Sequence, residues 1–440
     1  MILSTSLLIA ALAVTQTLAI PSSAYTFSAY PSSTASPFTP QNLTSFTQPS
    51  SPNNFTIDGP YLEVVHEIYN LTTFPTGVAV DQDNRIFINF PRSASNNDIT
   101  LGLADSFNTT VAYPNASIQT CQPGQNVSTC FVNVQSVVID SAQRIWALDT
   151  GAGPGQTDAV EYGAKIMSFN LTTNEMIDNY VLPYSISANG TSINDVRFNL
   201  SMSTAGVAFL TDEQGSLVII DLASHTYTRR LFNTSVVAAD ELFVGSFDGT
   251  PFYEWKGTQR SHVGIGSDGI ALANGNLYFA PLASRRLYQI NQTVLANASL
   301  TDTEILNAVE FIGQVGSYLE GFTADDQGRV YMGTAEQNSI TYFNTSISSL
   351  TNSTMLNGIN ASSTNATNEG VIPASDIEVA PFVRSADIQW PDSMCIENGY
   401  LWFTTNQLPL QGTYQRNDIT KASLPYKVYR TSVGGAGPAV

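Results

Sequence analysis

The chain has 440 residues, of which 43% are hydrophobic, so it can bury a sizeable core as two or three domains or as one repeat domain. Only 12% of the residues are charged, the formal net charge is −19, and the 17 Lys and Arg residues form no cluster. This balance argues against nucleic acid and anionic membrane surfaces as partners.

Residues 1–19 have the features of a secretory signal peptide. An apolar stretch at 7–14 precedes Thr17-Leu18-Ala19, which fits a small-x-small cleavage site. The stretch is too short to span a bilayer, and no later segment is suited to do so. We therefore expect a secreted, extracellular protein. Residues 20–58 are rich in Ser, Thr and Pro, which predicts a disordered linker suited to O-glycosylation.

N-glycosylation signals agree with secretion. Of the 34 Asn residues, 16 lie in Asn-x-Ser/Thr sequons, well beyond the number that chance gives. Glycans need surface positions, so many loops should face water. The predicted sites are Asn42, Asn54, Asn70, Asn108, Asn115, Asn126, Asn170, Asn189, Asn199, Asn233, Asn291, Asn297, Asn344, Asn352, Asn360 and Asn365.

The chain contains three cysteines. Cys121 and Cys130 flank the turn-rich segment QPGQNVST, which in a secreted chain predicts a disulfide closing a small loop. Cys395 lies in an apolar run, so we expect a buried free thiol that acts as a small hydrophobe. A zinc site is not indicated, because the histidines are few and scattered: His66, His225 and His262.

Six segments share one pattern: a polar pair, an apolar run, a polar turn and an aromatic-rich apolar run. Their starts lie about 50 to 75 residues apart, which is typical of propeller blades with insertions. Further alternating runs follow several of them, and helical periodicity is scarce. The segments are 74–90, 134–151, 193–212, 267–284, 319–338 and 390–408.

Six units of four antiparallel strands predict an all-β fold, a six-bladed β-propeller over residues 59–432, in which ring closure removes free sheet edges. Strands at 62–68 and 426–432 should close the ring, and 433–440 should form a C-terminal tail. A pair of β-sandwiches is the alternative, but it does not explain six similar units. A second low-complexity stretch, 345–368, predicts a long glycosylated loop inserted in the fold.

One polar residue recurs just before the small residue that opens each apolar run. Because the innermost strand of each blade runs along the central axis, these equivalent positions should form a ring at one mouth of the channel. The ring carries a charge of −3, and no Lys or Arg occupies an equivalent position. Its members are Thr76, Gln135, Asn194, Asp268, Glu320 and Asp392.

Two interpretations of the ring stay open. Crowded carboxylates in a partly dry pore repel one another, which predicts a compensating cation, either a divalent metal or the amine of a ligand. Alternatively, the ring is a water-filled pore mouth in which each acid caps nearby backbone amides. Aromatic residues at matching positions of the second runs are expected in the core between blades: Phe87, Trp146, Tyr278, Tyr331 and Trp402.

Several segments follow one another in the order seen in a known family: FPTGVAVDQDNRIFINFPR, RIWALDTG, INDVRF, SLVIIDL, SDGIAL with LYFAPLASRRLY, and WPDSMCIENGYLWFTTNQL. Through them, the chain resembles the major royal jelly protein/yellow family over about residues 61–430. The resemblance implies a secreted six-bladed propeller. Family members variously act in pigment formation as dopachrome-type conversion factors, bind biogenic amines or serve as nutritive proteins, so no single catalytic set carries over.

A more distant likeness to gluconolactonase-type propellers implies a divalent metal, Ca or Zn, at the axis. Those enzymes hold their metal through Glu, Asn and Asp. Asn194 in INDV and Asp268 in SDGI fit this pattern, whereas Glu320 in LEGF would supply the carboxylate from a different blade.

We therefore expect a binder of a small aromatic or cationic molecule at the axial mouth, which could act on a pigment or secondary-metabolite precursor. If the protein is an enzyme, isomerisation through acid–base work by Asp268, Glu320 or Asp392 is favoured. The alternatives are metal-dependent hydrolysis of a lactone and a non-catalytic extracellular binding or scaffold role. The ligand would be an aromatic amine, a quinone-like molecule or a lactone.

Overall fold

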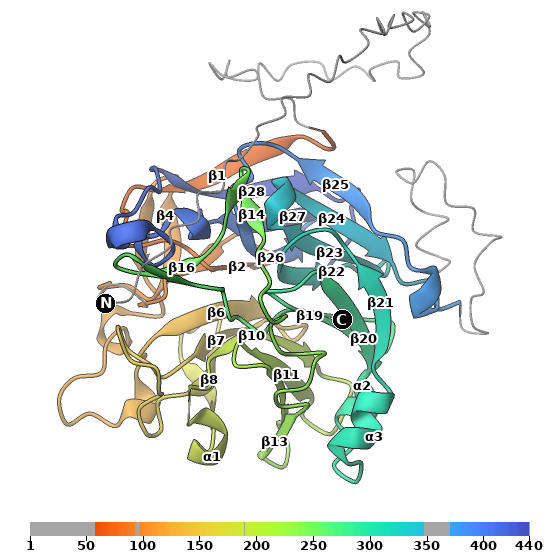
Figure 1. The fold of residues 1–440 in the computed structure, drawn as a ribbon. Coiled ribbons are helices and arrows are strands. Elements are labelled where there is room, and N and C mark those ends of the chain that lie inside the picture. Colours follow the sequence, from red (N-terminus) through yellow and green to blue (C-terminus); the bar gives the residue numbers. More distant parts are fainter. Residues whose placement is uncertain (1–57, 93–96, 189, 347–369, 440) are drawn as a thin grey trace, which may run out of the picture. The chain divides into compact units, whose positions relative to one another are not determined.

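The computed structural model describes residues 58–92, 97–188, 190–346 and 370–439. In these residues the strands form six four-stranded antiparallel sheets arranged around one axis, which confirms the predicted six-bladed β-propeller (Figure 1). The expected linker, up to residue 57, and residues 347–368 of the expected insertion lie outside the described residues. None of the described helices is long and apolar enough to cross a membrane.

The blades follow one another along the chain, each built from the axis outwards. Blade 1 holds β2 (Gly77–Val80), β3 (Ile86–Asn89), β4 (Leu101–Ser106) and β5 (Thr109–Ala112). Blade 2 holds β6 (Val134–Ile139), β7 (Arg144–Asp149), β8 (Lys165–Asn170) and β9 (Met176–Val181). Blade 3 holds β10 (Ile193–Asn199), β11 (Val207–Asp212), β12 (Ser216–Asp221) and β13 (Thr226–Arg230).

The second half repeats the arrangement. Blade 4 holds β18 (Ser267–Ala273), β19 (Asn276–Pro281), β20 (Arg286–Asn291) and β21 (Glu310–Gln314). Blade 5 holds β22 (Leu319–Ala324), β23 (Arg329–Thr334), β24 (Ser339–Asn344) and β25 (Ala380–Arg384). Blade 6 holds β26 (Pro391–Glu397), β27 (Tyr400–Thr405), β28 (Tyr426–Ser432) and, outermost, β1 (Leu62–Ile68).

Blade 6 closes the ring. Its outer strand β1 comes from the N-terminal side of the propeller and pairs antiparallel with β28, with Leu62 opposite Thr431. The predicted closure by these two strands is therefore confirmed. Because both ends of the propeller share one sheet, the ring cannot open without breaking this strand pair.

Apolar side chains between neighbouring blades form the core. Trp146 of blade 2 stacks on Phe198 of blade 3, with ring centroids 4.5 Å apart. The five aromatic residues expected there are at most 2% exposed, which confirms their core position: Phe87, Trp146, Tyr278, Tyr331 and Trp402. They hold the blades together and leave the axis to the polar ends of the inner strands.

Short elements fill the connections. The loop after blade 1 holds the 3-10 helices η1 (Ala116–Ile118) and η2 (Val127–Thr129) and the predicted disulfide Cys121–Cys130, which is confirmed, while Cys395 is free. Helix α1 (Tyr184–Ser187) precedes blade 3. Blade 4 carries α2 (Gln292–Leu295) and α3 (Asp302–Asn307), and blade 5 carries η3 (Ala335–Gln337) and η5 (Ala374–Asp376).

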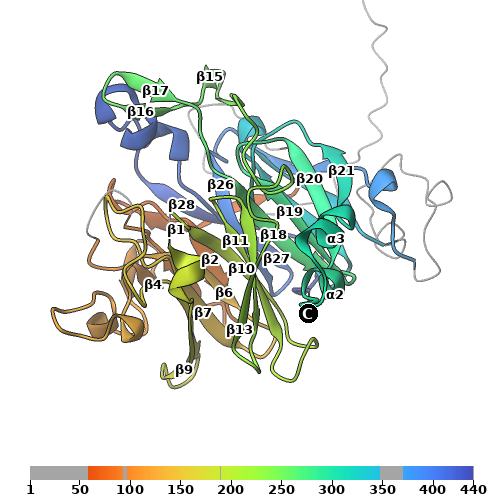
Figure 2. The same ribbon diagram turned by 60° about the horizontal axis from the view of Figure 1, so that its bottom comes forward.

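Two longer insertions lie at one end of the propeller (Figure 2). Residues 246–261, between blades 3 and 4, form two hairpins from β14 (Ser246–Phe247), β15 (Thr250–Pro251), β16 (Glu254–Lys256) and β17 (Gln259–Ser261). Residues 408–418, between β27 and β28, form the 3-10 helices η6 (Leu408–Leu410), η7 (Gly412–Tyr414) and η8 (Arg416–Asp418). The backbone N–H of Asn417 donates to Gly257 O at 2.7 Å, so the insertions contact each other.

The C-terminal tail packs on the propeller. Val433 and Ala436 are buried, and the backbone N–H of Ala439 donates to Ala324 O of β22 at 3.0 Å. Residues 433–439 therefore belong to the folded unit.

Candidate functional site

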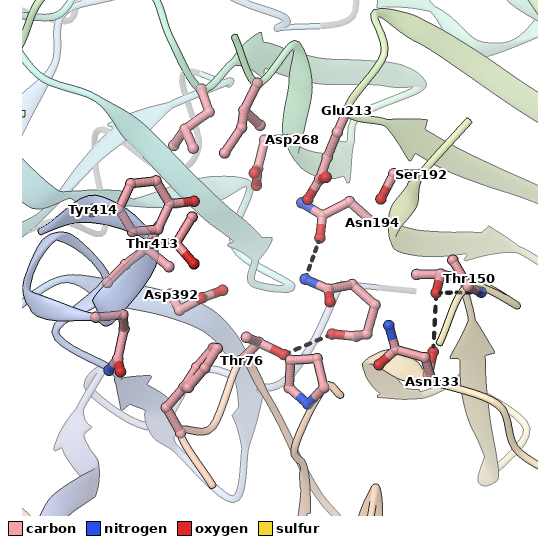
Figure 3. A pocket seen from close by; sticks show the side chains of 18 of the residues that line it. Thr76, Asn133, Thr150, Ser192, Asn194, Glu213, Asp268, Asp392, Thr413 and Tyr414 are labelled. Atoms are coloured by element: carbon pink, nitrogen blue, oxygen red, sulfur yellow. Dashed lines mark hydrogen bonds between the residues drawn. The ribbon is translucent and has the colours of Figure 1, made fainter. Parts of the chain in front are cut away.

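All six ring residues predicted from the sequence line one cavity of about 760 Å³ at the axis. Figure 3 shows Asp268, Asp392 and Asn194 reaching into it from different strands. The six inner strands are equivalent, and this equivalence places their ring residues around one cavity.

Irregular pairing turns the ring side chains towards the axis. In five of the six inner strands, the register of the pairing with the next strand shifts across the ring residue, for example between Ser267 and Ile270 around Asp268. A bulge of this kind interrupts the regular alternation of a strand and re-aims one side chain. The sixth residue, Thr76, instead precedes β2, and its N–H donates to Asn89 O at 3.3 Å.

Glycines after two of the acids allow the inner strands to approach closely. A Cβ atom on Gly269 would lie 2.5 Å from Glu320 O, and one on Gly321 would lie 2.8 Å from Asp392 O. Both separations are shorter than any real contact of a Cβ atom, so only glycine fits. The D-G and E-G pairs of the sequence therefore bring neighbouring acids close to one another.

The neutral half of the ring is joined by hydrogen bonds. The hydroxyl of Thr76 donates to Gln135 O at 2.9 Å, and Gln135 Nε2 donates to Asn194 Oδ1 at 3.0 Å. Asn89, on β3, donates through Nδ2 to Thr76 Oγ1 at 2.7 Å and to Gln135 O at 2.8 Å. These bonds fix the side chains of blades 1 to 3.

The pKa values of the three ring acids are raised. Burial raises the pKa of Asp268 well above its usual value, and the neighbouring Glu320 carboxylate raises this pKa further. Burial likewise raises the pKa of Glu320, with a further contribution from Asp392, and it raises the pKa of Asp392, with a further contribution from Asp268. Repulsion among the acids, expected from the sequence, therefore adds to a larger desolvation effect.

Each of these acids also accepts a hydrogen bond from a neutral donor. Trp390 Nε1 donates to Glu320 Oε1 at 2.5 Å, and Asn406 Nδ2 donates to Asp392 Oδ2 at 2.5 Å. These two bonds and one from Asn194 to Asp268 oppose the rise in pKa of the acids. The donors fix the orientation of the carboxylates without neutralising their charge.

A fourth acid, Glu213, was missed by the sequence reasoning. It follows β11, in the turn before β12, and lines the same cavity. Burial raises its pKa to about 7, and a hydrogen bond with Ser192 opposes the rise. In an antiparallel blade, the turn between the second and third strands lies at the same end as the start of the first. Polar residues of such turns were therefore candidates for the same pocket.

The remaining lining is apolar or neutral. Among the described residues that line the cavity, none is Lys, Arg or His, whereas four are acids. Tyr414 of η7 contributes an aromatic ring, and Phe74, Ile265 and Leu282 add apolar surface. The cavity thus combines concentrated negative charge with surface suited to the apolar body of a ligand.

A buried ion pair supports the wall on blade 2. Lys165 Nζ donates to Asp149 Oδ2 at 2.8 Å, and both side chains are 0% exposed. Asp149 also accepts from the backbone N–H groups of Val132, Asn133 and Gly151 at 2.8 to 2.9 Å. Asp149 therefore fixes the turn of the RIWALDTG segment, next to the cavity-lining residues Asn133 and Thr150.

Arg197 links the inner strands of two blades that are not neighbours in the ring. It starts from β10 in blade 3, pairs with Asp195 Oδ1 at 2.8 Å and donates through Nη2 to Phe322 O on β22 in blade 5. A second cavity of about 110 Å³, lined by Arg197 and by Pro438 and Ala439 of the tail, lies beyond it. The arginine therefore connects β10 with β22 and lines the second cavity but not the first.

The metal site implied by the gluconolactonase likeness includes two oxygens that already accept hydrogen bonds. Asn194 Oδ1 already accepts from Gln135, and Glu320 Oε1 already accepts from Trp390. A calcium ion needs six to eight oxygen ligands. Within the part of the chain that the structure describes, no group of three or more His, Cys, Asp or Glu side chains is arranged to hold a metal ion. The set Asn194, Asp268 and Glu320 stays a prediction, and we assign no chemistry to a metal.

Comparison with solved structures finds distant similarities. A structure described as a putative gluconolactonase is 9% identical, with a TM-score of 0.48, and the match covers 87% of this chain and 94% of that protein. A luciferin-regenerating enzyme is 11% identical with a TM-score of 0.46, covering 87% and 98%. These values do not bear on the chemistry of the cavity.

Comparison with known sequences identifies relatives. Major royal jelly protein 1 of Apis mellifera is 22% identical over 169 residues, 36% of this chain and 37% of that protein. Protein yellow of Drosophila guanche is 26% identical over 237 residues, 50% of this chain and 39% of that protein. The matches thus span less than half the length of these relatives. The family described as "Major royal jelly protein" matches residues 132–433, well over half of the chain. The chain therefore belongs to the major royal jelly protein family.

Proposed function

We propose that this protein is a secreted propeller that binds a small organic ammonium compound with an apolar or aromatic body in the axial cavity. One observation carries the proposal: four acids line the cavity, and none of its described lining residues is a base. A ligand ammonium group would supply the missing positive charge, and Tyr414 and Phe74 offer surface to the rest of the molecule. A simple pore mouth does not require an aromatic residue beside the acids.

Calorimetry with phenethylamine and with 2-phenylethanol, a neutral compound of similar size, tests the proposal. We expect the amine to bind and the alcohol to bind at least tenfold more weakly, because only the amine offsets the charge of the carboxylates. Titrations with Ca²⁺ and Zn²⁺ test the metal alternative on the same sample. Equal binding of amine and alcohol would contradict the proposal.

Binding should strengthen as the pH rises from 5 to 8. The pKa of Glu213 is about 7, so this acid in the cavity loses its proton in this range. An alkylammonium ion keeps its proton throughout, as Lys does. Calorimetry in buffers of different ionisation enthalpy should show that binding releases protons.

The ligand-free fold should respond with the opposite sign. An acid whose pKa is raised by folding stabilises the folded state below its unfolded pKa, and this stability is lost as the pH rises through the folded pKa. The melting temperature without ligand should therefore fall between pH 5 and 8, while the affinity rises. If the melting temperature and the affinity both rise or both fall between pH 5 and 8, the buried acids of the cavity are not the groups that bind the amine.

Acid–base isomerisation is the second candidate function. The observation that favours it is Glu213, whose pKa of about 7 allows it to donate and accept protons near neutral pH. A quinone-like substrate such as dopachrome would then exchange a carbon-bound proton with solvent. The test is the rate at which the substrate incorporates deuterium from D₂O. Catalysis by the wild type but not by Glu213→Gln would support isomerisation. Equal rates for the two proteins would count against it.

Secretion is tested by glycan occupancy. Among the predicted sites, the described residues expose Asn70, Asn108, Asn115, Asn126, Asn233, Asn291 and Asn297 and partly bury Asn170 and Asn199. Asn344 is only 3% exposed, and it lies in β24 opposite Arg329 of the neighbouring strand β23, so a glycan on its Nδ2 does not fit. Asn42, Asn54, Asn189, Asn352, Asn360 and Asn365 lie outside the described residues.

Glycopeptide mass spectrometry of protein secreted from eukaryotic cells should find the exposed sites occupied and Asn344 free. A protein retained in the cells without glycans would contradict secretion. A glycan on Asn344 would contradict the burial of that side chain.

A further inference from the structure

Trp390, the first residue of the WPDSMCIENGYLWFTTNQL segment, has an unusual place in the fold. It precedes β26, its side chain is fully buried, and its backbone φ is +62°. Bulky residues rarely adopt a positive φ, and such a conformation persists only where the surrounding contacts impose it. These contacts lie on two sides of the indole.

On one side, the indole reaches the acid ring. Its Nε1 donates to Glu320 Oε1 at 2.5 Å, across the boundary between blades 5 and 6. Glu320 is also faced by Asp392 of β26, Asp268 of β18, Glu213 of the β11–β12 turn and Tyr414 of η7. Trp390 thus supplies a neutral donor to a carboxylate that otherwise faces acids.

On the other side, the indole packs under the two insertions, which we call the cover (residues 246–261 and 408–418). The ring centroids of Phe252 and Phe247, in the first insertion, lie 5.0 and 6.1 Å from the ring centroid of Trp390. The ring of Phe252 in turn lies 4.8 Å, centroid to centroid, from the ring of Tyr414. Tyr414 belongs to the second insertion and lines the cavity. One aromatic cluster therefore connects the cover with the indole that holds Glu320.

A second connection runs through Asn406. Its side chain donates to Asp392 at 2.5 Å, its backbone N–H donates to Trp390 O at 3.3 Å, and its Oδ1 accepts from Leu408 N at 3.0 Å. Leu408 is the first residue of the second insertion. Both acids thus take a hydrogen bond from a residue that also contacts or adjoins the cover.

We propose that Trp390 is a positioning residue that couples the cover to the acid ring: it orients Glu320 towards the ligand only while residues 246–261 and 408–418 are docked, and ligand binding stabilises the docked cover. This inference rests on the proposed function. It adds the residue through which the cover and the ring act together.

The variant Trp390→Phe tests the coupling, because it keeps an aromatic ring and removes the N–H donor. Trp146→Phe is the matched control, since Trp146 Nε1 donates to Asp140 Oδ2 at 2.7 Å in the core, away from the cavity. We expect Trp390→Phe to weaken phenethylamine binding about tenfold and Trp146→Phe to leave it unchanged.

A double-mutant cycle separates positioning from general loss of packing. If Trp390 acts through Glu320, Trp390→Phe should weaken binding much less in a Glu320→Gln background than in the wild type. Equal effects in both backgrounds would overturn the role assigned to the indole.

Hydrogen exchange of residues 246–261, followed by mass spectrometry, supplies the second readout. Phenethylamine should slow exchange there in the wild type and in Trp146→Phe but not in Trp390→Phe. Unchanged affinity and unchanged protection in Trp390→Phe would overturn the inference while leaving the proposed function intact. If the wild type binds no amine, the proposed function fails. The coupling is then judged without ligand: faster exchange of the cover in Trp390→Phe than in Trp146→Phe supports it, and equal exchange overturns it.

Discussion

Asp268→Asn and Glu320→Gln should each weaken binding of an aromatic amine by about 1.5–3 kcal/mol, the usual scale for a hydrogen bond to a charged group. Each substitution removes one negative charge from the cavity and changes the shape of the side chain little. The fold without ligand should keep or gain stability near pH 8, because a desolvated carboxylate that faces other acids is lost. Calorimetry and thermal unfolding of the same samples measure both effects.

Asp105→Asn is the control for this experiment, since Asp105 is exposed on β4 and does not line the cavity. It removes one charge from the protein but none from the ring, so affinity should stay within the error of the wild type. If the three variants bind like the wild type, the axial cavity is not the binding site. If all three weaken binding equally, the overall charge of the protein, rather than the ring, attracts the amine.

Lys165→Met should lower the free energy of unfolding by about 3–5 kcal/mol, which is typical when one partner of a buried ion pair is removed. Asp149 would keep its three backbone donors but lose its ion-pair partner Lys165. Because Asn133 and Thr150 line the cavity beside this pair, amine binding should weaken as well. Denaturant unfolding gives the first quantity and calorimetry the second.

Arg384→Met is the matched comparison. Arg384 lies 4.0 Å from Asp58, both side chains are more than 60% exposed, and such surface pairs contribute at most about 1 kcal/mol. The double variant Asp149→Asn with Lys165→Met should recover part of the loss, because no unpaired charge stays buried. A Lys165→Met protein as stable as Arg384→Met would show that the backbone donors alone satisfy Asp149.

The blades and the ring could be predicted from the sequence because they repeat. At or near the start of each inner strand, a polar residue is followed by a small residue and an apolar run, so Asp268, Glu320 and Asp392 could be aligned without any structure. The same equivalence placed all six ring residues at one cavity. Repetition thus supplied the long-range information that a single strand does not contain.

Features that occur once could not be found in this way. The strands of residues 246–261 are two or three residues long, too short to show alternation. Tyr414 lies in an insertion present in one blade, and Asn406 lies just before that insertion. Arg197 reaches the axis through the length of its side chain, and no pattern in the sequence predicts which carbonyl it meets. Helix α3 is different, because its capping box of Thr301 and Glu304 was visible as a T-x-x-E motif.

The arginine that links blades 3 and 5 has a consequence for the rates at which a ligand enters and leaves the cavity. If the bond of Arg197 to blade 5 closes the channel, a ligand must leave the cavity by the way it entered. A slower opening of the entrance then slows association and dissociation by the same factor. The dissociation constant stays constant while the residence time lengthens. Substitutions at the entrance would therefore show in stopped-flow kinetics and not in equilibrium titrations, and a net charge of −19 would favour rapid arrival of cations at low salt.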